Sequence, residues 1–156
     1  MPKSLLQLSR REALHAACLG LAAIATGGLM APAANASLDD VHAAMKKYLG
    51  GAEPKPGRVT LTMAEVAENG ATVPYTVKVD SPMTDTDYVK AIYILADGNS
   101  TPDAASFHLT PDCGTAEVAG RMRLAKTQNV YALAAMSDGS FHIARTEVKV
   151  TIGGCG

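Results

Sequence analysis

The sequence has no tryptophan, and aromatic residues make up only 4% of its 156 residues. Its three cysteines, Cys18, Cys113 and Cys155, include no pair at the spacing of the disulfide that joins the two sheets of an antibody domain. In such a domain that disulfide packs against a buried tryptophan. These absences exclude antibody ancestry, but not the sandwich architecture that antibody domains share with many unrelated proteins.

An excess of basic charge is also missing. The formal net charge is −1, and removing residues 1–36, which carry three basic residues and one acidic residue, changes it to −3. A protein that binds nucleic acid needs a surface rich in lysine and arginine. From residue 37 onward there is no apolar run long enough to span a bilayer. We therefore expect neither nucleic-acid binding nor membrane insertion.

The residue combinations that mark enzymes are absent too. No glycine-rich phosphate loop follows an expected strand, and no nucleophile elbow occurs. The three histidines after residue 36 are scattered and lack metal-ligand spacing to the cysteines, and we interpret the two in strand patterns, His108 and His142, as satisfied or solvent-facing structural residues. The third histidine is His42. The sequence therefore predicts no catalytic residue, no metal and no cofactor.

Three aspartates, Asp80, Asp85 and Asp87, are close enough in sequence to form a cation-binding loop. Ser81-Pro82 interrupts the geometry of such a loop, and no glutamate follows that would close it with two oxygen ligands. We interpret this segment as a solvated turn.

Residues 1–36 have the pattern of an export signal. A basic start is followed by a weakly hydrophobic stretch rich in alanine and glycine, and Ala34-Asn35-Ala36 is a small-x-small site of the kind that signal peptidase cuts. Ser9 before Arg10 and Arg11, and Leu14 after them, match the twin-arginine motif of proteins exported in the folded state. A general secretory signal with two arginines is the alternative. We predict cleavage after residue 36 and a periplasmic location.

The segment 37–57 is predicted to hold a short N-terminal helix and a linker. Ser37 and Asp40 have the spacing of a capping box, and apolar residues follow at helical spacing as far as Leu49. Gly50-Gly51 ends the helical pattern. Residues 52–57 are rich in proline and glycine, which is typical of a linker.

From residue 58 the hydrophobic period changes from that of a helix to that of a strand. The run at residues 88–95 is apolar on both faces, which predicts a central strand, and Ser137-Asp138-Gly139-Ser140 between two apolar runs predicts a hairpin. Six or seven short strands at this spacing predict an all-β, immunoglobulin-like antiparallel β-sandwich over residues 58–152. The runs are residues 59–63, 73–79, 88–95, 107–109, 118–124, 130–136 and 141–152.

The last strand pattern leads directly into Gly153-Gly154-Cys155-Gly156. Glycine has no Cβ and adopts positive φ freely, so this arm is expected to be flexible and to expose its cysteine. Four residues reach about 13–14 Å when extended. Because the arm contains no lysine, arginine or histidine, nothing local favours the thiolate, and the thiol should need activation by the protein that receives it. We therefore predict a swinging arm at residues 153–156.

Composition alone is equally compatible with a frayed terminus that contains a cysteine by chance, or with one half of an intermolecular disulfide. Either of these would correspond to a different class of function. The protein would then be an exported sandwich that serves as a binding or assembly module, with Cys155 in a structural or intermolecular disulfide.

Several segments together resemble the SoxY sulfur carriers of the Sox sulfur-oxidation system. They are residues 63–70, 73–74, 79–83, 123–128 and 136–141, and the terminal arm. The resemblance covers nearly all of the chain after residue 36, and the twin-arginine-like leader is also typical of the family. It implies an immunoglobulin-like sandwich that pairs with a second sandwich subunit, SoxZ, as a heterodimer. It also implies that Cys155, flanked by Gly154 and Gly156, holds sulfur intermediates covalently.

The resemblance further implies a set of partner enzymes. A haem c enzyme couples thiosulfate oxidatively to the thiol, which gives a cysteine S-thiosulfonate. A dimanganese hydrolase then releases sulfate and leaves a persulfide. Where it is present, a molybdenum-haem dehydrogenase oxidises the outer sulfur, and a second hydrolysis regenerates the carrier.

The sequence departs from the family pattern at two places. Family members usually end in Gly-Gly-Cys-Gly-Gly, one glycine more than here, and a receiving channel that contacts the terminal carboxylate would be affected by that difference. Cys113 is additional to the usual single cysteine of the exported chain. It is either a tolerated small residue at a strand edge or the partner of Cys155 in a regulatory disulfide.

Overall fold

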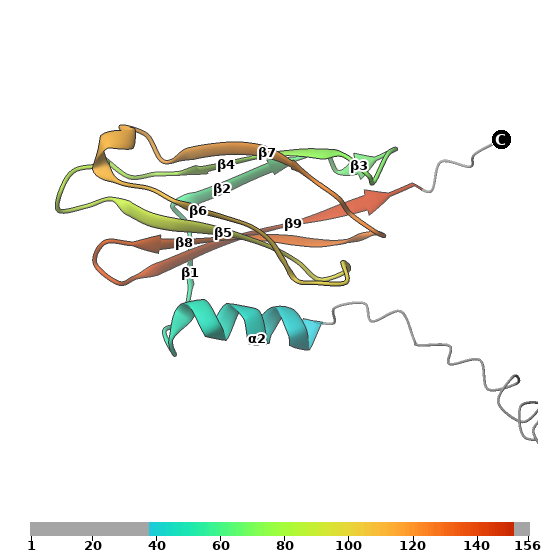
Figure 1. The fold of residues 1–156 in the computed structure, drawn as a ribbon, viewed down its shortest axis with the longest axis horizontal. Coiled ribbons are helices and arrows are strands. Elements are labelled where there is room, and N and C mark those ends of the chain that lie inside the picture. The colour runs from blue at the N-terminus through green and yellow to red at the C-terminus, as the bar shows by residue number, and fades with distance from the viewer. Residues whose placement is uncertain (1–37, 152–156) are drawn as a thin grey trace, which may run out of the picture. The chain divides into compact units, whose positions relative to one another are not determined.

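A computed structural model describes residues 38–151 of the chain. In this part, nine strands form two sheets, accompanied by helix α2 (Leu38–Leu49) and a single 3-10 turn, η1 (Pro111–Cys113). The predicted all-β sandwich with a short N-terminal helix is confirmed (Figure 1). The strands are β1 (Lys55–Pro56), β2 (Val59–Met63), β3 (Val66–Ala67), β4 (Val73–Val79), β5 (Val89–Ala96), β6 (Asp103–His108), β7 (Glu117–Met122), β8 (Gln128–Met136) and β9 (Phe141–Val150).

The larger sheet has the strand order β1-β9-β8-β5-β6, with β3 also paired to β9, and the smaller sheet has the order β2-β4-β7. Strand β5 lies between β8 and β6, as its apolar run predicts. In β4 every second residue is buried, so Tyr75 and Val77 point into the core between the sheets while Lys78 points to solvent. The period of two thus determines which face of each strand forms the core.

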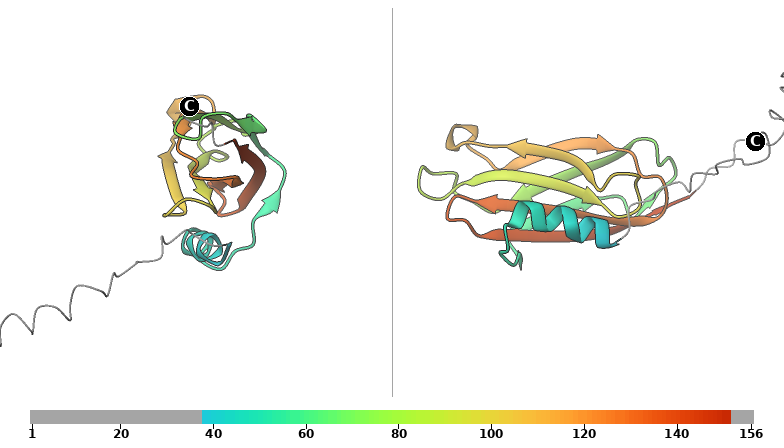
Figure 2. Two further views of the ribbon diagram at one scale, coloured as in Figure 1. Left: turned by 90° about the vertical axis from the view of Figure 1, so that its right-hand side faces the viewer. Right: turned by 60° about the horizontal axis from the view of Figure 1, so that its bottom comes forward.

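Helix α2 lies on the outer face of the larger sheet (Figure 2). Val41 and Met45, one helical turn apart, are buried against Leu95 of β5 and Tyr131 of β8, which forms a second, smaller core. None of the helices in the described range is long and apolar enough to cross a membrane.

The segment after α2 is more ordered than its composition predicts. Lys55 and Pro56 form β1, which pairs in parallel with His142 and Ile143 of β9. Proline has no N–H to donate, and it is tolerated here because β1 is the outermost strand of its sheet.

Strand β9 runs along the whole sandwich (Figure 1). It starts at the predicted hairpin, where the N–H of Met136 donates to the carbonyl of Ser140 at 2.9 Å, and it ends at Val150. Nine residue steps along a strand span about 30 Å. We call the hairpin end of the sandwich the far end, and the end at which β9 stops the arm end.

Candidate functional site at the root of the C-terminal arm

Most of the predicted site residues lie outside the described range. These are Cys155 with its neighbours Gly153, Gly154 and Gly156, and the two arginines of the export signal, Arg10 and Arg11. What the structure describes is the root of the arm, which we define as residues 148–151. These residues determine the point on the sandwich from which the predicted arm starts.

On one side the arm root is paired with strand β3. The N–H of Lys149 donates to the carbonyl of Glu65 at 2.9 Å, and the N–H of Thr151 donates to the carbonyl of Ala67 at 3.0 Å. These are the hydrogen bonds of a short parallel ladder, in which Val66 pairs with Lys149. The ladder holds the chain in place as far as Thr151.

On the side of the arm root that faces β8, the side chain of Thr127 provides the hydrogen-bond acceptor that a longer β8 would provide. Strand β8 begins at Gln128, which pairs with Val148, so no β8 residue is available to pair with Val150. The hydroxyl of Thr127 accepts a hydrogen bond from the N–H of Val150 at 3.0 Å. Three consecutive N–H groups at the arm root, those of Lys149, Val150 and Thr151, therefore have hydrogen-bond partners within the protein.

A close approach of two loops supports the root. The N–H of Leu124 donates to the carbonyl of Gly70 at 2.7 Å. A Cβ atom at position 70 would overlap the Leu124 carbonyl oxygen and would lie 2.8 Å from Cγ1 of Val150. Position 70 therefore requires glycine because of contact, not because of its φ angle. The Asn69 side chain shapes the turn by accepting from the N–H of Ala71 at 2.9 Å.

The loop that carries Leu124 and Thr127 is braced by Gln128, which is 4% exposed. Its Oε1 accepts from the N–H of Gly98 at 2.7 Å, and its Nε2 donates to Oδ1 of Asn99 and to the carbonyl of Lys126, each at 3.1 Å. Asn99 in turn donates to the carbonyl of Arg123 at 2.8 Å. A buried amide with both ends hydrogen-bonded favours a single loop conformation. We call residues 65–70 and 123–128, with Gly98 and Asn99, the collar.

Cys113 is exposed and lies in η1, at the far end of the sandwich (Figure 1). His108, the last residue of β6, is level with Phe141, the first residue of β9, across β5 and β8. The arm root is therefore about 30 Å from that level, and an extended chain from Thr151 to Cys155 reaches only about 14 Å. Within one folded chain the two cysteines cannot meet. The regulatory disulfide between Cys113 and Cys155 stays a prediction, and the reach of the chain allows it only between two copies.

The other polar groups singled out from the sequence do not gather at the arm root. Within residues 38–151 no cluster of histidine, cysteine, aspartate or glutamate could hold a metal ion. Asp87 forms an ion pair with Arg58 at 3.3 Å, and Asp80 and Asp85 are exposed. These contacts belong to the far end, where a cavity of about 420 Å³ opens beside Arg58 and Lys78.

The histidines differ from one another. His42 and His108 are exposed, whereas His142 is half-buried and its Nδ1 atom is buried without a hydrogen-bond partner. His108 is therefore solvent-facing, which is one of the two predicted alternatives, whereas His142 is neither solvent-facing nor satisfied at Nδ1.

Few titratable groups in the described range have a clearly shifted pKa, and none of them lies in the collar. Burial, reinforced by the hydrogen bond to Asp103, raises the pKa of Tyr48. Hydrogen bonds from Ser140 lower the pKa of Asp138 in the β8–β9 turn.

The residues that hold the arm root cannot be recognised as functional from their local sequence. Thr127, Gly70 and Gln128 belong to the segments 63–70 and 123–128, which stand out in the sequence only through their family resemblance. Both segments resemble the same family although they are more than 50 positions apart, and this shared resemblance is the one sequence signal of a function. The sequence does not show that the two segments meet at one place.

Comparison with known proteins gives one family and one fold. The sequence model of the family described as sulfur oxidation protein SoxY matches residues 45–155. The solved structure of the sulfur carrier protein SoxY from Chlorobium limicola f thiosulfatophilum is similar with 33% identity and a TM-score of 0.63, over 74% of this chain and 100% of that chain.

Solved structures of proteins with a different activity are similar at lower sequence identity. Superoxide reductase (neelaredoxin) from Ignicoccus hospitalis has 16% identity and a TM-score of 0.55, over 75% of this chain and 95% of that chain. At this identity the likeness concerns the fold alone. No curated protein sequence matches the chain.

Proposed function

Because the chain belongs to the SoxY family of sulfur oxidation proteins, we propose that it is the covalent sulfur carrier of a thiosulfate-oxidising system, with its intermediates bound to Cys155. The observation that carries this proposal is the extent of the family match, which includes the arm and ends at Cys155 itself. The arm root, fixed by the collar on both sides of β9, is the part of the described structure that supports it.

In this proposal a rigid root carries an arm that consists of three glycines and one cysteine. The hydrogen bonds to Ala67 and Thr127 hold β9 straight to its end, so the arm starts from a fixed point at the arm end of the sandwich. Beyond Thr151 the sequence Ile152-Gly153-Gly154-Cys155 gives a reach of about 14 Å. Such an arm can carry a thiol into a narrow channel of another protein, whereas a cysteine on the sandwich surface could not enter one.

The proposed chemistry at Cys155 is a cycle of bond formation and hydrolysis. The thiol and thiosulfate lose two electrons to a haem c enzyme and release one proton, and a disulfide bond forms between Sγ and the outer sulfur of thiosulfate. Water then attacks the terminal sulfonate sulfur in a dimanganese hydrolase, which releases sulfate with two protons and leaves a deprotonated persulfide on Cys155. The covalent bond keeps the reactive sulfur on the carrier while it moves between enzymes.

The proposed setting is the periplasm, where the carrier would work as a heterodimer with a SoxZ-like sandwich subunit. The twin-arginine pattern at Arg10 and Arg11 supports this, because that route exports folded proteins and can therefore export complexes. A molybdenum-haem dehydrogenase is a further proposed partner, for oxidation of the persulfide.

Labelled thiosulfate tests the proposal. The heterodimer is incubated with the haem c coupling enzyme and thiosulfate that carries radioactive sulfur in either the outer or the inner position. Both labels should become attached to the wild type and to Cys113→Ser, and neither to Cys155→Ser. Addition of the hydrolase should then release the inner label as sulfate and leave the outer label on the protein. Equal labelling of Cys155→Ser would contradict the proposal.

A further inference from the structure

Val66 is the one large hydrophobic side chain in the described part of the chain that is strongly exposed, at 50%. It lies in β3, whose other residue, Ala67, is buried in the core. The alternation of a strand therefore turns Val66 outward. A single exposed valine is common on protein surfaces, so its meaning depends on what surrounds it.

The surface around Val66 is hollowed on both sides. One hollow, of about 300 Å³, is lined by residues of the turn and of β4 that include Ala64, Asn69 and Pro74. The other, of about 350 Å³, is bordered by Arg145 and Glu147 of β9. Val66 lines both hollows and so forms an apolar ridge between them. A ridge between two hollows is a shape on which another protein surface can close, with a buried apolar centre.

The ridge lies beside the arm root. Val66 pairs with Lys149, which is three residues before Ile152 in the sequence. Three residues of strand correspond to about 10 Å. A protein that draws Cys155 to the bottom of a channel must bring its surface to the root of an arm only about 14 Å long. The channel mouth therefore has to lie against the collar, and Val66 is within the area that it would cover.

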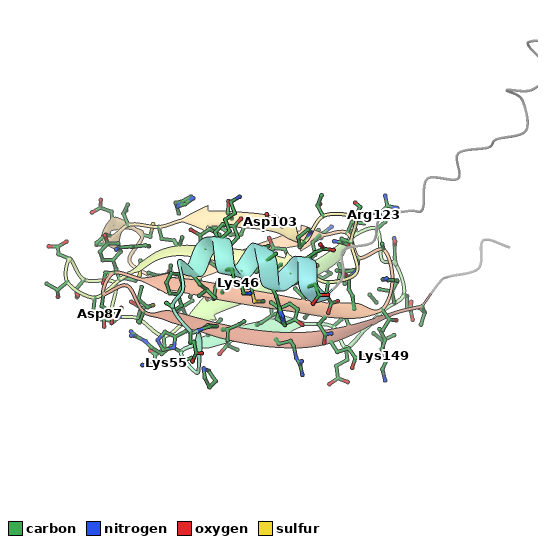
Figure 3. All side chains as sticks on the ribbon, turned by 90° about the horizontal axis from the view of Figure 1, so that it is seen from below. Lys46, Lys55, Asp87, Asp103, Arg123 and Lys149 are labelled. Atoms are coloured by element: carbon green, nitrogen blue, oxygen red, sulfur yellow. The ribbon has the colours of Figure 1, made fainter. Side chains whose placement is uncertain are left out.

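Charged side chains lie beside the apolar centre and around the arm root. Val66 shares one hollow with Glu65, Arg145, Glu147 and Lys149. Lys149 and Arg123 lie on opposite sides of the point where the described chain ends (Figure 3). Like Lys126 in the same loop as Arg123, they are exposed, and within residues 38–151 none of the three takes part in an ion pair. An apolar centre with a polar, solvent-accessible rim is the arrangement found in protein–protein interfaces.

We propose that Val66 and its two hollows form a docking surface for the haem c enzyme that loads the arm, with Val66 seated in an apolar depression beside the mouth of that enzyme's channel. The proposal rests on the carrier function proposed above. The surface would hold the enzyme in register while the arm is inside the channel. The weak contact of one apolar side chain suits a carrier that must leave each enzyme after every step.

A charge at position 66 tests the docking surface. In the heterodimer, Val66→Asp is compared with the conservative Val66→Ile and with Thr110→Asp, which places the same charge on an exposed residue at the far end. Single-turnover loading by the haem c coupling enzyme is measured over a range of enzyme concentrations. Val66→Asp should raise the half-saturating concentration about tenfold, as expected for the loss of one well-buried apolar contact. The limiting rate should stay the same, and both controls should behave as the wild type.

Alkylation of Cys155 by a small maleimide and the melting temperature should not change in any variant, because Val66 is exposed and β3 pairs through its backbone. Loading of Val66→Asp at wild-type concentrations would overturn the docking surface and leave the carrier function intact. Dissociation of the heterodimer by Val66→Asp, seen in size-exclusion chromatography, would also overturn it, since Val66 would then belong to the subunit interface. A wild type that never acquires sulfur would overturn the carrier function and the docking surface with it.

Discussion

The hydroxyl of Thr127 accepts the N–H of Val150 at 3.0 Å, one residue before the described chain ends. Strand β8 does not extend far enough to pair with Val150, so a side chain from the preceding loop supplies the missing acceptor. The end of β9 is thereby held from both sides as far as Thr151. The predicted arm therefore starts from a fixed point on the sandwich.

Thr127→Val should weaken the attachment of the arm root to the collar, because valine keeps the size and shape of the threonine side chain but cannot accept the hydrogen bond. The variant removes the acceptor of the Val150 N–H, and the loss of one such hydrogen bond costs about 1 kcal/mol of the free energy of unfolding. Amide hydrogen exchange at Val150 should become at least several-fold faster. Thr62→Val on β2 is the control, because that threonine is exposed and its hydroxyl makes no hydrogen bond within residues 38–151. Unchanged exchange at Val150 would show that Thr127 does not hold the arm root.

Gly70→Ala should destabilise the collar. The added methyl group would overlap the Leu124 carbonyl and press on Val150, and forcing a group into a filled space costs about 1–3 kcal/mol. Denaturant unfolding measures the loss. The control is Gly139→Asn in the β8–β9 turn, which has open space and a positive φ that asparagine tolerates. Equal stability of Gly70→Ala and the wild type would mean that the two loops do not pack as described.

The double variant Gly153→Ala, Gly154→Ala should separate reactivity from transfer. Two methyl groups restrict the backbone only modestly, so the rate of Cys155 alkylation by a small reagent should barely change. A channel fitted to a bare backbone has no room for side chains, so enzyme-dependent loading should fall at least tenfold. Proline at both positions should reduce loading further, because it fixes φ. Parallel changes in the two rates, or no change in either, would argue against an arm that threads a channel.

Oxidation of the purified protein should produce no disulfide within a single chain. The distance from the arm root to Cys113 exceeds the reach of the arm, so Cys113 and Cys155 can join only between two molecules. Non-reducing electrophoresis should therefore show a dimer whose amount rises with protein concentration. The variant Cys113→Ser should retain only dimers linked through Cys155. A monomer that contains a Cys113–Cys155 bond would disprove the described position of η1.

Local patterns in the sequence predicted most of the scaffold. The spacing of Val41 and Met45 identified α2, the doubly apolar run identified β5 as central, and the Asp138-Gly139 turn identified the hairpin. The two-residue strands β1 and β3 could not be predicted, because two residues carry no hydrophobic period. Their pairing with β9 depends on tertiary contacts that no local pattern records.

For the candidate site too, one part could be predicted from the sequence and another could not. Glycines on both sides of Cys155 indicated an arm from composition and reach alone. The collar was not predictable, since Gly70 and Thr127 are brought together by the order of the strands and their roles depend on one hydrogen bond and one close contact. The docking role of Val66 likewise depends on its distance from the end of β9.

The central claim is that Cys155 carries sulfur. Its most direct test is the intact mass of the heterodimer purified without reductant after reaction with thiosulfate and the haem c coupling enzyme, followed by fragmentation to locate the modification. We predict a mass increase equal to one bound thiosulfonate, or one extra sulfur after addition of the hydrolase, located on Cys155 and removed by a thiol reductant. A thiol at Cys155 that stays unmodified, or an adduct on Cys113 instead, would contradict the account.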